Sequence, residues 1–172
     1  YYARRFKALV AFLSNRMEAV GEPLEAALAI YGREPGLLRM AGAYCSAAGE
    51  REQALSAYRL LASLPGCADG FLHCARLYAE QGLYECANED CRRYLETNPE
   101  DADALCLAGR ISHAMDRLEE ACSFYESAHD LNPDDMEPLL ALTQLYAEQI
   151  DSADSQSFGS AMRRRFVRDK RR

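Results

Sequence analysis

The stretch ADALCLAGRISHAMDRLEEACSFYESAHDLNPDD, residues 102–135, decides how the rest of this chain can be interpreted. Counted from its first residue, small residues stand at positions 8 and 20, which are Gly109 and Ala121. Tyr125 stands at position 24 and Pro133 at position 32. Small residues at two such places let two helices cross closely, and an aromatic ring fills the space beside them. Proline lacks an N–H group and clashes with the preceding turn, so it ends the second helix. The stretch therefore predicts a helical hairpin.

The same pattern recurs along the sequence at a period of 33 or 34 residues. Two earlier units, 35–67 and 68–101, repeat the small residues of positions 8 and 20 as Gly42, Ala54, Ala75 and Ala87. The first of these units lacks one residue in its closing turn, and the start of a further unit follows from Met136. Such self-similarity is the signature of a repeat array, in which each unit buries its apolar face against the next.

The repeated pattern resembles the tetratricopeptide repeat, a 34-residue helix–turn–helix with small residues at 8 and 20, an aromatic at 24 and proline at 32. The resemblance covers roughly residues 22 to 150. It implies an all-α fold class, a right-handed superhelix of antiparallel helix pairs. Alanine and leucine dominate over the β-branched residues that strands prefer, in agreement with this fold.

The pattern predicts the following division of the chain. A degenerate first helix pair is expected at 1–34, and three full units follow at 35–67, 68–101 and 102–135. The first helix of a final partial unit is expected at 136–150, and a polar linker with a basic tail at 151–172. The glycines at 49 and 82 and the Asp116-Arg117 pair mark the expected turns inside the units. The chain opens on Tyr1 rather than on methionine, so we expect it to be part of a longer protein.

Charge is distributed unevenly along the chain. The formal net charge is −7, yet residues 163–172 hold seven basic residues and one acid, so the body is near −13 and the tail near +6. The basic residues of the tail are Arg163, Arg164, Arg165, Arg168, Lys170, Arg171 and Arg172. Three readings of the tail stay open: a solvated segment, a nuclear-import or nucleic-acid address, and a docking segment. If it docks, Phe158, Met162 and Phe166, four residues apart, are expected to form its buried side.

No constellation of residues points to catalysis, a cofactor or a metal. Three histidines and seven cysteines occur, without a CxxC pair or a phosphate-binding loop. We interpret the cysteines as free thiols that pack as small hydrophobic residues, with disulfides or metal binding as the alternative. No apolar run approaches the ~20 residues of a membrane span.

The family resemblance implies where a partner binds. Its first helices line a groove with positions 2, 5, 9 and 12, which predicts groove residues Arg39, Ala43, Leu72, Arg76, Cys106, Arg110, His113 and Gln144. Arg76 and Arg110 stand 34 residues apart at equivalent places, on one expected row. The alternative is that they are solvated or paired with Asp69 and Asp103. The basic clamp with which the family's chaperone adaptors grip a C-terminal carboxylate is absent.

Together these features predict a non-enzymatic protein–protein interaction scaffold, intracellular and either cytoplasmic or nuclear, without a cofactor or a membrane partner. We expect it to bind an extended or helical, acidic segment of a partner within a multi-subunit assembly. Two other functions stay open. One is a nucleic-acid-associated subunit that contacts nucleic acid only through the basic tail. The other is a small acidic chaperone of a secretion system.

Overall fold

The computed structural model describes residues 33–147, and this part of the chain is entirely helical apart from its turns. Six helices follow one another: α3 (Pro35–Ala47), α4 (Arg51–Ala62), α5 (Asp69–Glu80), α6 (Tyr84–Leu95), α7 (Ala102–Ala114) and α8 (Leu118–Leu131). A further helix begins at residue 136 and is described up to 147. Within the described range no strand occurs, so the prediction of an all-α fold is confirmed.

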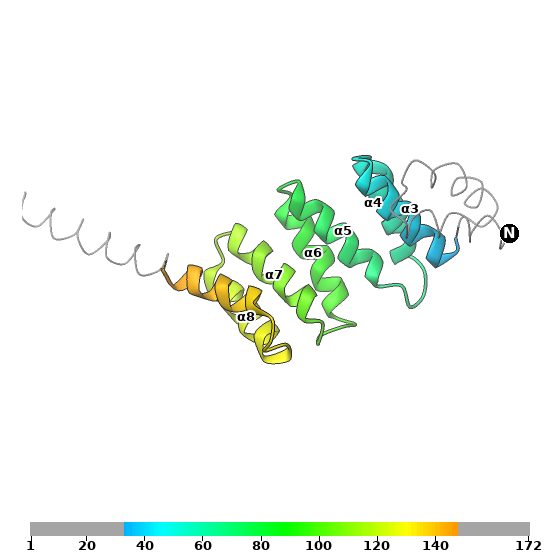
Figure 1. Ribbon diagram of the computed structural model, residues 1–172. Coiled ribbons are helices and arrows are strands. Elements are labelled where there is room, and N and C mark those ends of the chain that lie inside the picture. Colours follow the sequence, from blue (N-terminus) through cyan, green and yellow to red (C-terminus); the bar gives the residue numbers. More distant parts are fainter. Residues whose placement is uncertain (1–32, 148–172) are drawn as a thin grey trace, which may run out of the picture.

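The helices are arranged as a row of antiparallel hairpins (Figure 1). α3 pairs with α4, α5 with α6 and α7 with α8, and each hairpin packs against the next through its neighbouring helices. α5 also contacts α7, so first helices of successive hairpins lie next to each other. This is the helical-hairpin solenoid that the repeat pattern predicts. The predicted first pair and the tail fall on residues outside the described range, except for residues 33 and 34.

Local sequence determines where the helices begin and end. The side chain of Glu34 accepts a hydrogen bond from the N–H of Leu37 at 2.8 Å, and Asp101 accepts one from the N–H of Ala104 at 3.0 Å. These carboxylates satisfy amide groups that the first turn of a helix leaves unpaired. Within the hairpins, the chain reverses through positive φ at Gly49, Gly82 and Asp116, where the sequence predicts turns.

Small residues allow the two helices of each hairpin to pack closely. The alanine at position 20 is fully buried in all three hairpins, as Ala54, Ala87 and Ala121. At position 8, a Cβ atom added to Gly42 would lie 2.3 Å from the ring of Tyr58. The aromatic ring of position 24 thus occupies the space that the glycine leaves open, as the sequence pattern predicts.

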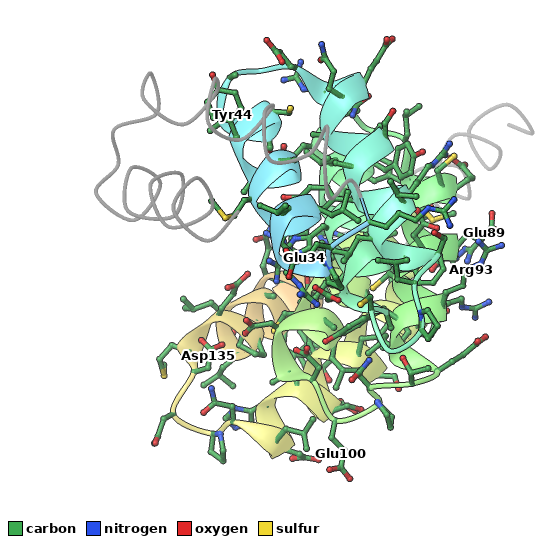
Figure 2. The ribbon with its side chains drawn as sticks, turned by 90° about the vertical axis from the view of Figure 1, so that its right-hand side faces the viewer. Glu34, Tyr44, Glu89, Arg93, Glu100 and Asp135 are labelled. Carbon is green, nitrogen blue, oxygen red and sulfur yellow. The ribbon has the colours of Figure 1, made fainter. Side chains whose placement is uncertain are left out.

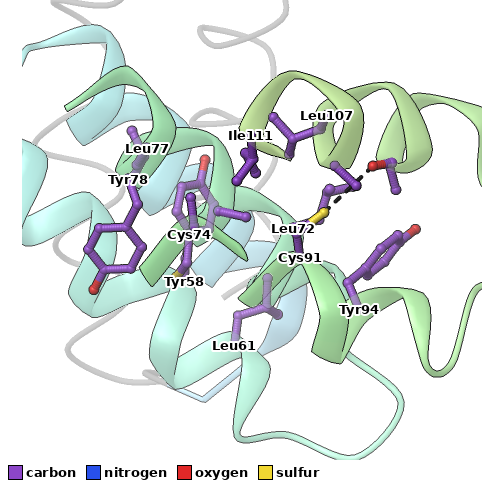
Figure 3. Packing of buried hydrophobic residues seen from close by; sticks show 14 of the residues in the cluster. Tyr58, Leu61, Leu72, Cys74, Leu77, Tyr78, Cys91, Tyr94, Leu107 and Ile111 are labelled. Atoms are coloured by element: carbon purple, nitrogen blue, oxygen red, sulfur yellow. Dashed lines mark hydrogen bonds between the residues drawn. The ribbon is translucent and has the colours of Figure 1, made fainter. Parts of the chain in front are cut away.

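The main core runs through three hairpins without a break. Its buried residues extend from Leu38 on α3 to Ile111 on α7, and Figure 3 shows Tyr58, Cys91 and Leu107 among them. The thiol of Cys91 donates a weak hydrogen bond to the carbonyl oxygen of Ala104 at 3.6 Å, which joins α6 to α7. Within the described residues, no helix combines the length and the apolar composition that a membrane crossing requires.

Candidate partner-binding groove

Two arginines at equivalent repeat positions, Arg76 on α5 and Arg110 on α7, line one open depression of about 360 Å³. We call it the arginine depression. Its other lining residues are Ala79, Glu80, Tyr84, Leu107, Ile111 and Ala114. Beside the two guanidinium groups, the lining contains one carboxylate, Glu80, the ring of Tyr84, and small or aliphatic side chains. The depression therefore presents positive charge next to apolar surface, between first helices of neighbouring hairpins.

Helical spacing explains why these arginines face outward. On α5 the neighbours Ala75 and Leu77 are buried in the main core, whereas Arg76 between them is exposed. Arg110 on α7 is likewise exposed next to buried Ile111. Because successive residues of a helix are about 100° apart, burial of the flanking residues directs each guanidinium away from the core.

The two arginines differ in their carboxylate partners. Arg110 forms a long ion pair of 4.0 Å with Glu137, and both side chains are 59% exposed. Arg76 has no carboxylate within 4.0 Å among the residues that the structure describes. An exposed pair at such a distance contributes little to stability, typically under about 1 kcal/mol. An incoming carboxylate therefore has little to displace at either guanidinium.

The alternative prediction is that the two arginines are solvated or paired with Asp69 and Asp103. Both arginines are exposed, and the described residues contain no ion pair between them and these aspartates. Asp69 instead receives two hydrogen bonds from Arg39 of α3, from Nε at 2.5 Å and from Nη2 at 3.0 Å. This bidentate bond lowers the pKa of Asp69 and raises that of Arg39, because it favours the charged form of both groups. Arg39 is thus neutralised by its neighbour hairpin, whereas Arg76 is not.

The charge of Arg76 influences titratable groups around it. The pKa of His73 is lowered, first by burial and then by the positive charge of Arg76. The imidazole of His73 stacks on the ring of Tyr58 with 4.5 Å between centroids. The neutral form of His73 is therefore favoured, and it adds no second positive charge one turn before Arg76.

The other predicted groove residues have varied environments. Leu72 and Cys106 are only 7% and 6% exposed, so they offer almost no side-chain surface to a partner. Ala43 and His113 are half-buried, and Gln144 on the last helix is exposed. The predicted basic tail, 163–172, lies outside the described residues.

Of the eight residues that line the arginine depression, the predicted groove set contains only Arg76 and Arg110; the two polar ones it missed are Glu80 and Tyr84. Glu80 follows Arg76 by four residues, so it stands on the same face of α5 one turn later. Tyr84 begins α6 just beyond the turn at Gly82. Extending the groove positions from 9 to 13 would have predicted Glu80, since four residues is one helical turn. The place of Tyr84 in the depression depends on the direction that the chain takes after the turn at Gly82. Repeat spacing alone does not determine that direction.

The cysteines of this chain are free thiols in the structure, and all seven lie within the described residues. Burial raises the pKa of Cys74 to about 12 and that of Cys91 and Cys106 to about 11. These thiols are protonated at neutral pH and pack as small hydrophobic residues. No group of three potential metal ligands occurs among the described side chains.

A second depression, of about 410 Å³, lies between α4 and α6 and has a different character. Its guanidinium groups already have partners. Arg93 pairs with Glu89 at 2.6 Å, as Figure 2 shows at the edge of the molecule, and lies 5.6 Å from the ring of Phe71. Arg59 donates a hydrogen bond to the hydroxyl of Tyr78. Because its charges are satisfied internally, this depression is less suited to an acidic ligand than the arginine depression.

Comparison with known proteins agrees with this architecture. A family model described as the tetratricopeptide repeat matches residues 102–135. No curated protein matches the sequence. Several solved structures share the fold, including MamA (residues 41 to the end) from Desulfovibrio magneticus RS-1, which is 17% identical with a TM-score of 0.79. That alignment covers 93% of this chain and 92% of MamA.

Two other similar structures carry descriptions of peptide binding. YrrB, described as a repeat protein with an unusual peptide-binding site, is 21% identical with a TM-score of 0.71 over 81% of this chain and 72% of its own. The first repeat domain of Spaghetti (RPAP3), solved with the HSP90 peptide SRMEEVD, is 21% identical with a TM-score of 0.64. It covers 67% of this chain and 93% of its own. At these identities the likeness establishes the fold alone.

Proposed function

We propose that this chain, a tetratricopeptide-repeat protein, is a non-enzymatic scaffold that holds an acidic segment of a partner protein in the arginine depression. Proteins of this fold are generally interaction scaffolds. The bound segment is extended or helical, and the chain acts within a multi-subunit assembly. The observation that carries the proposal is the pair Arg76 and Arg110, which line one depression on a chain of net charge −7.

Charge and shape support an acidic ligand. A guanidinium group binds a carboxylate through two parallel hydrogen bonds, and Arg76 has no carboxylate partner among the described residues. Within the part of the chain that the structure describes, the ion pair of Arg110 is a 4.0 Å contact with Glu137. Between the two arginines, Ala79 and Ala114 leave room for an apolar side chain of the ligand. We therefore expect a segment in which one or two acidic residues flank an apolar one.

Short acidic peptides bound to related folds make this mode physically reasonable. The peptide of the Spaghetti complex, SRMEEVD, ends in two glutamates, a valine and an aspartate. The present chain lacks the basic clamp of the chaperone adaptors, so its carboxylates would be held by Arg76 and Arg110 instead. Internal acidic segments are then as suitable as C-terminal ones, because neither arginine requires a chain terminus.

Binding to arrays of synthetic peptides that vary in acidic and apolar residues tests the proposal. The double variant Arg76→Glu/Arg110→Glu should lose the acidic peptides that the parent chain retains, with an unchanged far-UV circular dichroism spectrum. The matched control is Arg92→Glu/Arg117→Glu, because it makes the same charge change at two exposed arginines that both contact Glu120. Retention of acidic peptides by the first variant would contradict the proposal.

Two further measurements separate charge from shape. Binding should weaken as salt increases, since exposed charges are screened over about 8 Å at physiological ionic strength. The variant Ala114→Leu narrows the depression without a change of charge. It should therefore weaken the binding of peptides that carry a bulky apolar residue. If peptides of all charges bind equally at high and low salt, the arginines do not select the ligand.

A further inference from the structure

Exposed apolar side chains gather at one end of the repeat array. Among the described residues, six large hydrophobic side chains are strongly exposed, and five of them lie between 131 and 146. They are Leu131, Met136, Leu139, Leu140 and Tyr146, of which Leu140 is 65% exposed. The sixth, Leu83, stands alone at a turn between α5 and α6. Contiguous apolar surface of this kind indicates an interaction site, whereas an isolated leucine does not.

The helix at 136–147 is buried on one side only. Leu142 and Leu145 pack against Ala121 and Tyr125 of α8, with 7% and 0% exposure. The exposed part of this helix carries Met136, Leu139, Leu140 and Tyr146. We call these four side chains the terminal face; they belong to the orange helix that follows α8 in Figure 1.

Most residues at the equivalent places of earlier hairpins are buried. Leu139 is 39% exposed, whereas the same repeat position is Leu38 at 3%, half-buried Phe71 and Leu105 at 7%. Leu140 corresponds to Leu72 and Cys106, which are 7% and 6% exposed, and to exposed Arg39. Tyr146 corresponds to Tyr78 and Ser112 at 7% and 1%, and to half-buried Cys45. In those hairpins a second helix and the next repeat provide the cover. The terminal face therefore has the composition of a surface that another segment covers.

The sequence around the terminal face is acidic, and Arg92, Arg110 and Arg117 contact only two of its carboxylates among the described residues, Glu120 and Glu137. Residues 118–147 contain seven aspartates and glutamates and no lysine or arginine. The hydroxyl of Tyr146 donates a hydrogen bond to Glu126 at 3.2 Å, so one of these carboxylates adjoins the terminal face directly. A segment that covers the face is favoured if its polar side is basic, because opposite charges attract and like charges repel.

We propose that the terminal face is covered by residues 158–172 of this same chain. This segment combines an apolar row, Phe158, Met162 and Phe166, with seven basic residues between 163 and 172. The apolar row fits the exposed leucines and Tyr146, and the basic side chains fit the acids of 118–147. The spacing of four places the apolar row on one side of a helix. The opposite charges of body and tail then face each other within one molecule.

The connecting residues are long enough for the chain to return. Ten residues lie between the last described residue and Phe158, and seven of them, 151–157, form the polar linker that the sequence predicts. An extended chain spans roughly 3.5 Å per residue, whereas the helix at 136–147 is about 18 Å long at 1.5 Å per residue. The linker can therefore lead back along the helix. Its polar, serine-rich sequence gives it no apolar face of its own to bury.

Photo-crosslinking in the full chain tests this proposal. A benzophenone amino acid replaces Leu140 on the terminal face, and the crosslinked residues are identified by peptide mass spectrometry. We expect a crosslink within one molecule to residues 158–172. The matched control carries the benzophenone at Leu83, which is also an exposed leucine but lies far from the terminal face in sequence. The control should give no crosslink to 158–172.

Two outcomes overturn the proposal. Crosslinks between two molecules, seen as a dimer on a denaturing gel, would mean that a second copy covers the face. Absence of any crosslink to 158–172 at low salt would mean that the segment does not bind there. In the chain that carries the benzophenone at Leu140, the triple change Phe158→Ser/Met162→Ser/Phe166→Ser should abolish the crosslink. The same triple change should speed hydrogen exchange in 136–147. Because the crosslink is measured on the chain alone, without a peptide, its outcome is distinguishable from that of the proposed peptide binding.

Discussion

Gly109 on α7 and Tyr125 on α8 are in such close contact that a Cβ atom added to the glycine would lie 2.8 Å from Cε1 of the ring. The first hairpin repeats this relationship with Gly42 and Tyr58. The middle hairpin has Ala75 and Cys91 at the same two repeat positions, and both are buried. A larger residue at position 8 thus accompanies a smaller one at position 24. The two positions share one volume between the helices.

Gly109→Ala should destabilise the chain for this reason. Overpacking of a close contact costs about 1–3 kcal/mol, while the higher helix propensity of alanine returns about 1 kcal/mol. We expect a net decrease in the free energy of unfolding, measured by urea denaturation. In the background Tyr125→Cys, which makes the pair of the middle hairpin, the same change should be neutral or stabilising. Equal effects of Gly109→Ala in both backgrounds would contradict the shared-volume interpretation.

The alanines of position 20 should be equally intolerant of larger side chains. Ala121 is fully buried where α7 and α8 cross, so Ala121→Leu should lower the free energy of unfolding by about 1–3 kcal/mol. The matched control is Ala114→Leu, because Ala114 is exposed at the end of α7. Ala114→Leu should change the free energy of unfolding by no more than about 0.5 kcal/mol. Similar melting temperatures for Ala121→Leu and the parent chain would refute the repeat frame.

Asp101 connects two hairpins through two hydrogen bonds. Its Oδ2 accepts from the hydroxyl of Tyr94 at 2.6 Å, and its Oδ1 accepts from the N–H of Ala104 at the start of α7. Tyr94→Phe should cost about 1 kcal/mol for the lost hydrogen bond. Asp101→Ala should cost more, since it removes a helix cap worth about 1 kcal/mol and also leaves the hydroxyl unpaired. Thermal unfolding of both single variants and the double variant measures the coupling, and purely additive losses would argue against the shared carboxylate.

Alkaline pH should unfold this chain in a defined range. Burial raises the pKa of Tyr58 and Tyr125 to about 12, and burial with the hydrogen bond to Asp101 raises that of Tyr94 to about 12. Tyrosine in an unfolded chain titrates at about 10, so the folded state holds these protons more tightly. Their contribution to stability is complete below pH about 10 and is lost as the pH rises towards about 12.

Buried thiols should extend this range to lower pH. The pKa of Cys91 and Cys106 is raised to about 11, whereas an unfolded thiol titrates at about 8.5, so their contribution begins to fall near that value. Urea midpoints in reducing buffer between pH 7 and 11 measure the combined effect. We expect a constant midpoint near neutrality and a steady decrease above pH about 9. A midpoint that stays constant to pH 11 would show that these groups titrate normally.

Repeat spacing predicts the fold well because the features that define it are local. The small residues of positions 8 and 20, the ring of position 24 and the turns at Gly49 and Gly82 all follow from a period of about 34 residues. Asp116 is instructive, since it adopts positive φ where the other turns have glycine. The turn at Asp116 could be predicted from its place in the repeat, although aspartate, unlike glycine, does not by itself indicate positive φ.

The candidate groove could be predicted only in part. Arg76 and Arg110 face outward because the residues beside them are apolar, and that pattern is visible in the sequence. Burial of Leu72 depends on packing by the following hairpin, which one unit's pattern does not reveal. The partner of Asp69 likewise comes from α3, thirty residues earlier, whereas the sequence pattern offers Arg76 of the same unit as an alternative partner. Contacts between units are thus the part that repeat positions determine least.

The uneven extent of the core has a consequence for how the molecule comes apart. One large cluster of buried residues extends from Leu38 to Ile111. The buried residues of α8 and of 136–147 belong to two small clusters, which are Leu105, Cys106 and Ala128, and Ala121, Tyr125, Leu142 and Leu145. In a repeat array, each unit is stabilised only by its neighbours, so unfolding can proceed in segments. The amide protons of α8 and of 136–147 should therefore exchange before those of α5 and α6. Partial opening at this end would leave α5 and α6 folded while Glu137 withdraws from Arg110.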